Sequence, residues 1–390
     1  MSAESDLVSL VRSHLLLRNE ISARYIPQYC EPLACVCQEM SERFLRGGRL
    51  LAFGFGPYAT DAQHVSVEFV HPVIVGKRAL PALDLSAAPA SMLNVLARPD
   101  DIVMGFAPPE GDSRIHDLLE GARRRGMLVC EWPGRLGEHA LSAATSDPLI
   151  HQEITELMYH TLWETVHVFF EQNARGDDIG AAAFLYPFLG QSEETTADTL
   201  ADVASSIQQK AHDDERLRVQ FAAEQSLTLA QAALAIHQRV ASGGVLLTFG
   251  NGGSATDAND LAIDCVDPPA PMRPVPAISL SMESANVSAI ANDVGVELVF
   301  LRQLIANGRP QDVAVGISTS GKSKNICAAL REARKRGMLT LALLGYDGGD
   351  IVREQLADYA LVVKSEYIPR IQEVQASIYH TLRLAIASIN

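Results

Sequence analysis

The sequence predicts an α/β protein made of two tandem copies of one domain, each with a doubly wound parallel sheet covered by helices. Three observations support this prediction. Short apolar runs alternate with helical patterns, three segments of the first half recur in order in the second half, and a glycine turn follows the first apolar run of each half. Such alternation is typical of parallel sheets. A length of 390 residues suits two domains of average size.

The repeat rests on three pairs of matching segments. The longest pair, RGGRLLAFGFGPYATDAQH at 46–64 and SGGVLLTFGNGGSATDAND at 242–260, agrees at 11 of 19 positions. The offset between partners grows from 196 here to 211 and then 220 in the next two pairs, LEGARRRGMLV with LREARKRGMLT and MYHTL with IYHTL. The first copy therefore lacks about two dozen residues that the second contains, as expected for a diverged duplicate.

The stretch between the copies is polar, acidic and glycine-containing around Asn173–Thr199, which is typical of a linker followed by a helix start. We therefore expect copy one at residues 1–172, a linker at 173–198 and copy two at 199–390. The apolar run AAAFLYPFL inside this linker is expected to pack against a domain.

In copy two, a long helix is expected first, over Thr199–Ser242. Five apolar runs then have the character of strands: VLLTFG, VPAISLS, DVAVGIS, LTLALLG and ADYALVVK. Helical patterns such as Lys324–Gly337 separate them, and a last helix is expected over Pro369–Ile389. Copy one is expected to repeat this order, so that each copy forms a three-layer α/β/α sandwich.

Two loops of copy two have the features of phosphate-binding sites. The first, TFGNGGSATDA, runs from a strand through a glycine turn into a helix, and the second, GISTSGKSKNI, places four hydroxyls at the same kind of junction. Helix N-termini attract anions, and open α/β sheets bind ligands at the carboxyl ends of their strands. The alternative is a pair of ordinary strand-to-helix turns. Neither loop fits the P-loop or dinucleotide-binding pattern.

The composition disfavours several classes of function. The net charge of −15 opposes general nucleic-acid binding, and no apolar run approaches the roughly 18 residues that span a membrane. The N-terminal residues lack the pattern of a signal peptide, and the six cysteines fit neither a zinc ribbon nor a disulfide framework. We expect a cytoplasmic protein with free thiols that binds a small molecule.

The motifs GNGGSATDA, AIANDVG, DVAVGISTSG, GYDGG and RIQEVQASIYH resemble those of the SIS (sugar isomerase) domain, in particular the phosphoheptose isomerases. The resemblance covers nearly all of Thr199–Asn390 and extends to 7–172 as a diverged copy. It implies conversion of sedoheptulose 7-phosphate to D-glycero-D-manno-heptose 7-phosphate through an enediol. It also implies a set of substrate-binding residues: Asn251, Gly252, Gly253, Ser254, Asn292, Asp293, Ser318, Thr319, Ser320, Ser323 and Gln372.

In the family that copy one resembles, two helices supply the catalytic and zinc-binding side chains. Copy one keeps all four positions of that pattern as His64, Glu68, Gln152 and His160, and their helical spacing places each pair on one face. The resemblance therefore implies Zn²⁺ at these four residues, with Glu68 and His160 as catalytic groups. The alternative is that they are relics or structural groups. The loops of copy one have changed to GFGPY and GFAPPEGDS, in which prolines and Glu110 disfavour phosphate.

Copy two shows the reverse change. Asp260 and Asp264 stand where the family has His and Glu, whereas Gln372 and His380 are kept. The resemblance implies that Asp264 and His380 are catalytic, and Asp260 weakens the case for zinc in this copy. The complementary losses lead to the hypothesis that copy two binds the sugar phosphate while copy one supplies the metal and acid–base groups.

The leading functional prediction is a phosphoheptose isomerase or a close aldose–ketose phosphate isomerase. A non-catalytic sugar-phosphate sensor or adaptor is the alternative, which Asp260 and Asp264 favour and which a DnaA-binding SIS relative exemplifies. A third reading is a phosphosugar-processing enzyme of a secondary pathway. Because SIS domains commonly assemble, we expect a homodimer that contains four such domains.

Overall fold

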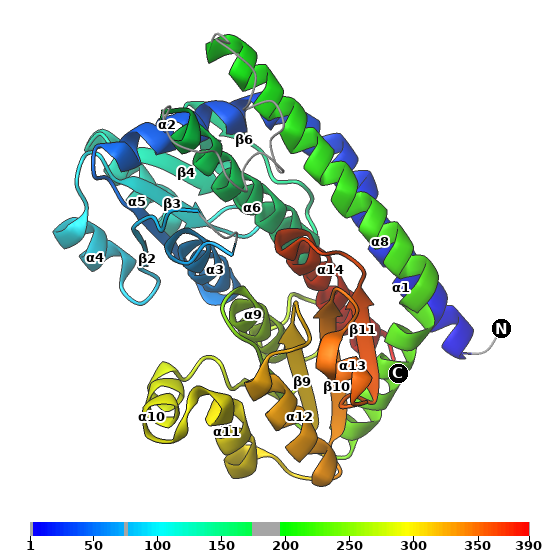
Figure 1. Ribbon diagram of the computed structural model, residues 1–390. Coiled ribbons are helices and arrows are strands. Elements are labelled where there is room, and N and C mark those ends of the chain that lie inside the picture. The colour runs from blue at the N-terminus through cyan, green and yellow to red at the C-terminus, as the bar shows by residue number, and fades with distance from the viewer. Residues whose placement is uncertain (1–2, 74–76, 174–195, 390) are drawn as a thin grey trace. The chain divides into compact units, whose positions relative to one another are not determined.

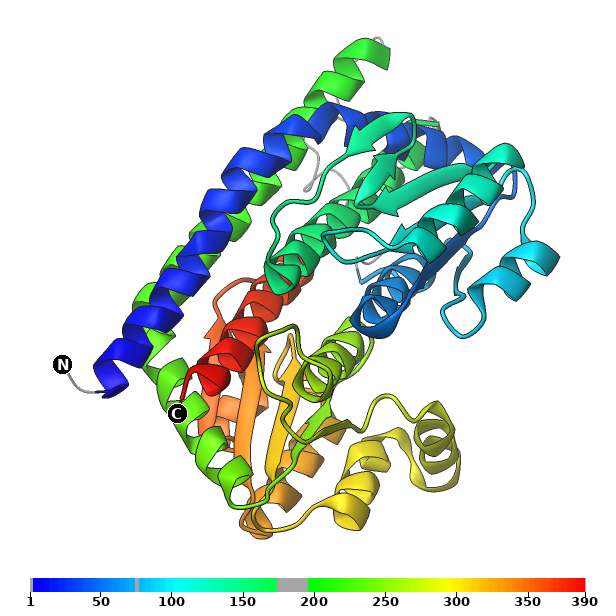
Figure 2. The same cartoon turned by 180° about the vertical axis from the view of Figure 1, so that it is seen from behind.

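In the computed structural model the chain forms two compact units, each built around its own sheet (Figures 1 and 2). The structure describes residues 3–73, 77–173 and 196–389. The C-terminal unit consists of Met1–Asn19 and Asp214–Asn390, and the N-terminal unit of Glu20–Asp213. The predicted α/β class and the two tandem, mainly parallel sheets are confirmed.

The sheet of the C-terminal unit is parallel throughout, with the strand order β11-β10-β9-β7-β8. Each strand falls within one of the apolar runs expected to be strands: β7 Leu246–Phe249, β8 Ala277–Ser279, β9 Val313–Ser318, β10 Leu339–Gly345 and β11 Tyr359–Val363. Every residue of β7, β9 and β10 is buried, because helices cover both faces of the sheet.

Two layers of helices enclose this sheet. Apolar side chains of α8, α9 and α14 form one core with the sheet, and those of α11, α12 and α13 form another. The helices of this part of the chain are α8 Thr196–Ala241, α9 Gly253–Val266, α10 Ser284–Val294, α11 Val299–Asn307, α12 Lys324–Lys335, α13 Gly349–Arg353 and α14 Ile368–Ser388, with the 3₁₀ turn η4 Val296–Leu298. The expected three-layer sandwich is therefore present.

The N-terminal unit repeats this plan with one change at the sheet edge. Its strand order is β2-β1-β3-β4-β5-β6, and the last two strands are antiparallel. The strands are β1 Leu50–Gly54, β2 Ala82–Asp84, β3 Ile102–Phe106, β4 Leu128–Trp132, β5 Gly134–Leu136 and β6 His139–Leu141. The helices are α2 Cys30–Leu45, α3 Ala59–Val70, α4 Pro89–Leu96, α5 Ser113–Arg124 and α6 Pro148–Asn173, with η1 Ile26–Gln28 and η2 Gly56–Tyr58.

The residues that copy one lacks are accounted for at two places. The N-terminal unit has the single helix α4 where the C-terminal unit has α10, η4 and α11. It has the short hairpin of β5 and β6 where the C-terminal unit has α13 and the parallel strand β11. The expectation that both copies share one order of elements is therefore wrong at the last strand, because a chain this short returns by a hairpin instead of a crossover.

The first helix, α1 Ala3–Tyr25, contributes to both units. Its residues Leu7, Val11 and Leu15 belong to the core of the C-terminal unit, whereas Ile21 and Tyr25 belong to that of the N-terminal unit. The compact units thus divide inside α1 and α8. The repeat boundaries at 172 and 199 stay a prediction, and most of the expected linker at 173–198 lies outside the described residues.

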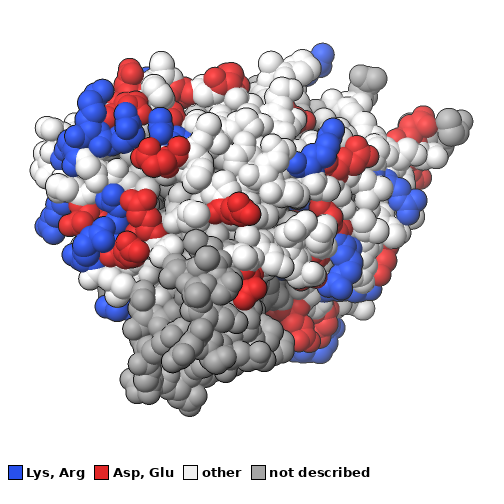
Figure 3. All heavy atoms as spheres, turned by 90° about the horizontal axis from the view of Figure 1, so that it is seen from above, with Lys and Arg blue, Asp and Glu red and all other residues white. Residues whose placement is uncertain are grey.

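The surface and the helices agree with the composition. Acidic and basic side chains are interspersed on the face shown in Figure 3, so the negative charge is not gathered in one patch of the described residues there. Within the described ranges, none of the helices has the length and apolar character needed to cross a membrane.

Candidate functional site

The first glycine loop joins β7 to α9 in the C-terminal unit. A Cβ added at Gly250 would lie only 2.1 Å from the Ser254 carbonyl oxygen, so only glycine fits there. In the N-terminal unit, a Cβ added at Gly54 would lie at the same distance from the Tyr58 carbonyl oxygen. Gly252 is the N-cap of α9, has a φ of +58° and offers no side-chain cap. In the first turn of α9 the amides of Ala255 and Thr256 donate to the Gly252 carbonyl, which leaves those of Gly253 and Ser254 for an anion.

The second loop follows β9 and turns through its own hydroxyls. The Ser318 hydroxyl accepts a hydrogen bond from the Gly321 amide at 3.1 Å and lies 3.2 Å from the Ser323 hydroxyl. The Ser320 hydroxyl accepts a backbone amide two residues on, and the Thr319 carbonyl accepts another from the end of β10. Ser323 is the N-cap of α12 but makes no capping bond. A second helix N-terminus without a side-chain cap thus stands at this edge.

The two loops are joined by a pair of amides. Asn251 donates to Asn325 at 3.0 Å, and Asn325 donates to Asn251 at 2.8 Å. Asn325 also accepts the amide of Ile326 at 3.0 Å, at the start of α12. Sequence reasoning assigned Asn251 to the site but missed Asn325, although it follows the serine-rich loop directly. The structure therefore brings the two predicted loops together through side chains.

Asn292 and Asp293 are two predicted substrate-binding residues without a hydrogen bond to these loops in the described part of the chain. Both are exposed near the end of α10, and Asn292 donates to Asp293 at 2.9 Å. No residue of α10 is buried. Across the described residues, no hydrogen bond connects the pair to either loop, so their role stays a prediction.

A buried acid–base cluster lies along α9, the helix that begins in the first loop. Asp260 and Asp264 are one turn apart on α9, and the Nε2 atom of His380 on α14 lies 3.3 Å and 3.1 Å from their Oδ2 atoms. The Tyr379 hydroxyl donates to the Oδ2 atom of Asp260 at 2.8 Å. All three residues named in the sequence pattern are at most 3% exposed. Tyr379 was not predicted, although MYHTL and IYHTL both place a tyrosine before the histidine.

The carboxyl group of Asp264 is electrostatically unusual. Burial and the nearby Asp260 raise its pKa to about 6, against the opposing effect of His380. A carboxyl group with a pKa near neutral exchanges protons readily at physiological pH, which is the property required of a general acid or base. The predicted catalytic residues Asp264 and His380 are therefore in contact, with their side-chain atoms 3.1 Å apart.

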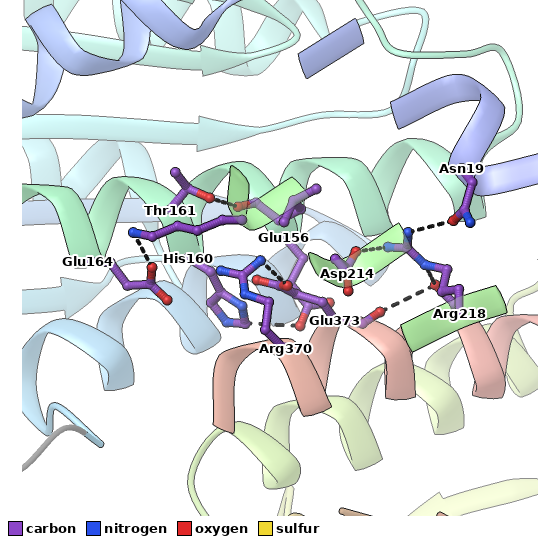
Figure 4. A network of polar contacts seen from close by, with 12 residues as sticks. Asn19, Glu156, His160, Thr161, Glu164, Asp214, Arg218, Arg370 and Glu373 are labelled. Carbon is purple, nitrogen blue, oxygen red and sulfur yellow. Dashed lines mark hydrogen bonds and ion pairs between the residues drawn. The ribbon is translucent and has the colours of Figure 1, made fainter. Parts of the chain in front are cut away.

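Helix α14, which carries His380, is held by buried polar contacts within its own unit (Figure 4). Arg218 of α8 donates to the Ser377 hydroxyl at 2.9 Å and to Asn19 at 3.1 Å, and it also pairs with Asp214. Arg370 and Glu373 form a second ion pair at 2.5 Å. The predicted residue Gln372 lies on the same helix, buried, two turns before His380. Through Arg218 these contacts tie α14, the helix that carries His380, to α8 and α1.

The N-terminal unit holds the second predicted cluster. The Nε2 atoms of His64 on α3 and His160 on α6 lie 3.2 Å apart, and the Oε1 atom of Glu68 lies 3.8 Å from that of His64. Together their ligand atoms fall within 4.8 Å of one another, as a metal site requires. The amide nitrogen of Gln152 donates to Thr60 at 3.3 Å and to Asp61 at 3.0 Å. Three of the four predicted ligands therefore converge on one point.

The loops of the N-terminal unit have features that disfavour phosphate. Asp112 caps α5 by accepting the Arg114 amide, so this helix start is already satisfied by a carboxylate. Next to it lies an open cleft of about 430 Å³ whose lining includes Glu110, Asp112 and Glu131. His116 bonds to Glu131 at 3.0 Å within this cleft. Negative side chains thus replace the hydroxyls of the C-terminal unit.

Comparison with known proteins agrees with this geometry. The SIS domain family model matches residues 211–345. The phosphoheptose isomerase of Solidesulfovibrio magneticus is 41% identical over 181 residues, which are 46% of this chain and 85% of the relative. The phosphoheptose isomerase of Desulfovibrio desulfuricans is 44% identical over 173 residues, which are 44% of this chain and 81% of the relative.

One similar solved structure is the C-terminal domain of glucosamine-fructose-6-phosphate aminotransferase from Francisella tularensis. The alignment covers 96% of this chain and 95% of that domain's chain, with a TM-score of 0.52 and 9% sequence identity. At that identity the likeness concerns the fold alone, and it spans both sheets. The fold and the matched domain define a tandem SIS-domain protein. The chain is more than 40% identical to these two phosphoheptose isomerases and covers more than 80% of the length of each. It therefore belongs to the phosphoheptose isomerase family of enzymes.

Proposed function

We propose that the protein is a phosphosugar isomerase that converts sedoheptulose 7-phosphate into D-glycero-D-manno-heptose 7-phosphate. The SIS fold and the family relationship support a phosphosugar isomerase, and the relatives named phosphoheptose isomerase support the choice of substrate. The observation that carries the proposal is that one helix, α9, links the proposed phosphate loop to the acid–base cluster. This helix begins at the first glycine loop and presents Asp260 and Asp264 to His380 further along.

The proposed phosphate site uses the two loops joined by Asn251 and Asn325. The N-cap residues of α9 and α12 make no side-chain capping bond, so amides of both helix starts are proposed as donors, except that of Ile326, which Asn325 accepts. The hydroxyls of Ser318, Ser320 and Ser323 supply further donors. Donors of this kind bind a phosphate monoester without a bulk basic patch, which suits a chain with a net charge of −15. Asn251, Gly252, Gly253, Ser254 and Thr319 remain in this proposed set, as do Asn292, Asp293 and Gln372.

The proposed chemistry is a proton transfer between two neighbouring carbons. Ionised Asp264 removes a proton from C1 of the ketose while His380 protonates the carbonyl oxygen at C2, which gives the enediol. The proton then returns to C2, and the C1 hydroxyl loses its proton to give the aldehyde, so no atom is gained or lost. Burial of both groups excludes water from the proton transfer. Tyr379 orients Asp260 beside them.

We also propose that the N-terminal unit binds Zn²⁺ through His64, Glu68, Gln152 and His160. Tetrahedral Zn–N bonds of about 2.0–2.1 Å place two nitrogens about 3.3 Å apart, which fits the 3.2 Å between His64 and His160. A bound zinc can polarise a carbonyl, or hold helices together when protein fills every position. Glu68 and His160 remain a second candidate acid–base pair, and the division of labour between the copies remains a hypothesis.

The competing function is a sensor or adaptor that binds a sugar phosphate without turnover. One experiment separates the two: purified protein is incubated with sedoheptulose 7-phosphate, with and without zinc, and the product is followed by NMR. Turnover identifies the isomerase. Tight binding without turnover under any metal condition identifies the sensor, which the aspartates at 260 and 264 would then explain.

The assembly and the location of the protein are part of the same proposal. We propose a cytoplasmic homodimer that contains four SIS domains, because the chain already carries two and the family assembles further. Light scattering of the purified protein should give the mass of a dimer, and a monomer at all concentrations would contradict this.

A further inference from the structure

Arg383 lies three residues after His380 on α14, and its side chain is one of the largest fully buried ones among the described residues. Residues three apart share a helix face, so Arg383 can reach α9 as His380 does. Its Nε atom donates to the carbonyl oxygen of Asp264 at 3.1 Å, and its Nη2 atom donates to the carbonyl oxygen of Arg273, beyond the end of α9. Sequence reasoning gave this arginine no role.

We propose that Arg383 is a positioning residue for the acid–base pair of Asp264 and His380. Its guanidinium group holds the end of α9 on α14 and keeps a positive charge near the carboxylate of Asp264. The inference rests on the proposed isomerisation by this pair and deepens it. It names a group that governs how the pair works without contact to the substrate.

The C-terminal end of α9 explains why an arginine suits this place. The carbonyl of Asp264 is one of the last four of the helix, which have no amide partner within the helix. The carbonyls on either side of it, those of Ile263 and Cys265, accept backbone amides from further along the chain. Arg383 supplies the donor for the carbonyl between them. A positive charge is also favourable at the negative end of a helix dipole.

The charge of Arg383 is not taken up by an ion pair. Among the described residues, none of the carboxylates lies within ion-pair distance of its guanidinium group, and its Nη1 atom has no hydrogen-bond partner. Burial lowers the pKa of Arg383, but a guanidinium group stays protonated in proteins. Burial and Asp260 raise the pKa of Asp264 to about 6, and the positive charge of Arg383 opposes them together with His380.

This charge matters for the proposed chemistry because Asp264 can act as a base only when it is ionised. On its own helix Asp264 faces a second carboxylate, Asp260, and on α14 it faces His380 and Arg383. The strands that pack on α9, which are β7, β8 and β9, have no charged side chain. Because two carboxylates close together tend to retain a proton, the permanent charge of Arg383 favours the ionised form of Asp264 at neutral pH.

The repeat gives an independent comparison. At the offset of 220, Arg383 corresponds to Trp163 and His380 to His160. Trp163 is also buried, so the N-terminal unit fills this position with a large side chain that has no charge. An uncharged side chain therefore satisfies the packing of this helix in the same fold. The guanidinium group in the C-terminal unit is explained by its contacts to α9 and not by its volume.

The test compares the pH profiles of full-length variants in the conversion of sedoheptulose 7-phosphate. Arg383→Met removes the charge at similar length, and Arg383→Lys keeps the charge. On the acid side, the pH at which kcat/KM falls to half should rise by about one pH unit in Arg383→Met and stay at the wild-type value in Arg383→Lys. The control Arg331→Met removes an exposed arginine of α12 and should match the wild type.

A second readout does not depend on turnover. In protein labelled with ¹³C at its aspartates, the carboxyl carbon of Asp264 is assigned by its absence in Asp264→Asn and titrated by NMR. Its midpoint should rise in Arg383→Met. If this variant misfolds, Arg383→Gln takes its place as the uncharged variant.

An unchanged NMR midpoint in the uncharged variant overturns the inference, even where turnover falls equally at every pH, because that pattern indicates a structural role alone. A midpoint in Arg383→Lys as high as in the uncharged variant also overturns it. Absence of turnover in the wild type would instead refute the proposed isomerisation, and the NMR titration would still decide whether Arg383 acts on Asp264.

Discussion

The side-chain amides of Asn251 and Asn325 are joined by two hydrogen bonds of 3.0 Å and 2.8 Å, which link the glycine loop to the serine loop of the C-terminal unit. Asn325→Ala removes both bonds, each of which contributes about 0.5–1.5 kcal/mol. We expect the Kd for sedoheptulose 7-phosphate, measured by calorimetry, to rise about tenfold. The control Asn94→Ala removes an exposed amide on α4 and should leave the Kd unchanged. An unchanged Kd in Asn325→Ala would show that the loops act independently.

The contrast between Ser323 and Asp112 gives a second prediction. Both are N-caps at the same place in the repeat, but only Asp112 accepts an amide of its own helix. Ser323→Ala should therefore raise the Kd for inorganic phosphate about threefold to tenfold, since it removes one hydrogen-bond donor. The Asp112→Asn variant should bind phosphate with the same Kd as the wild type. If Asp112→Asn changed phosphate affinity and Ser323→Ala did not, the phosphate site would lie in the other unit.

The raised pKa of Asp264 predicts how stability depends on pH. The folded-state pKa is about 6, above the ordinary value of 3.8, so between these values the folded chain holds a proton that the unfolded chain releases. The contribution of Asp264 to the free energy of unfolding should therefore fall by about 2 kcal/mol as the pH rises from 4 to 6. Urea unfolding of Asp264→Asn should lack this fall. A parallel pH dependence in both proteins would show that Asp264 titrates normally.

Sequence reasoning predicted most of the C-terminal unit because each of its strands is a continuous apolar run between turn residues. The loops were also predictable, since glycine and serine at strand-to-helix junctions have direct physical consequences. The pairing of Asp264 with His380 followed only from the family resemblance and from helical spacing. It needed the packing of α9 against α14, which no local pattern specifies.

Other features depend on tertiary contacts and were missed. The hairpin of β5 and β6 replaces a parallel strand because of deletions whose effect is not visible in the residues that remain. The sharing of α1 between two cores is likewise decided by packing and not by its own pattern.

The buried His151 in the first turn of α6 predicts acid sensitivity of the N-terminal unit. Burial lowers its pKa from 6.5 to about 4, so below pH 6.5 the unfolded chain binds a proton that the folded chain does not. Stability is therefore complete above pH 6.5 and is lost as the pH falls, by about 2 kcal/mol at pH 5. At the repeat offset of 220 its counterpart is Ile371. His151→Ile should flatten this loss in urea unfolding between pH 7.5 and pH 5, and an undiminished loss would assign it to other groups.

The central claim is that the C-terminal unit isomerises a sugar phosphate through Asp264 and His380. The most direct measurement is the rate of conversion of sedoheptulose 7-phosphate, followed by NMR for the wild type, Asp264→Asn and the control Asp267→Asn. Asp267 is exposed just beyond the end of α9. We predict turnover by the wild type and the control, and a loss of about 10²–10⁴-fold in Asp264→Asn with substrate binding retained. Full turnover in Asp264→Asn, or none in the wild type, would contradict the claim.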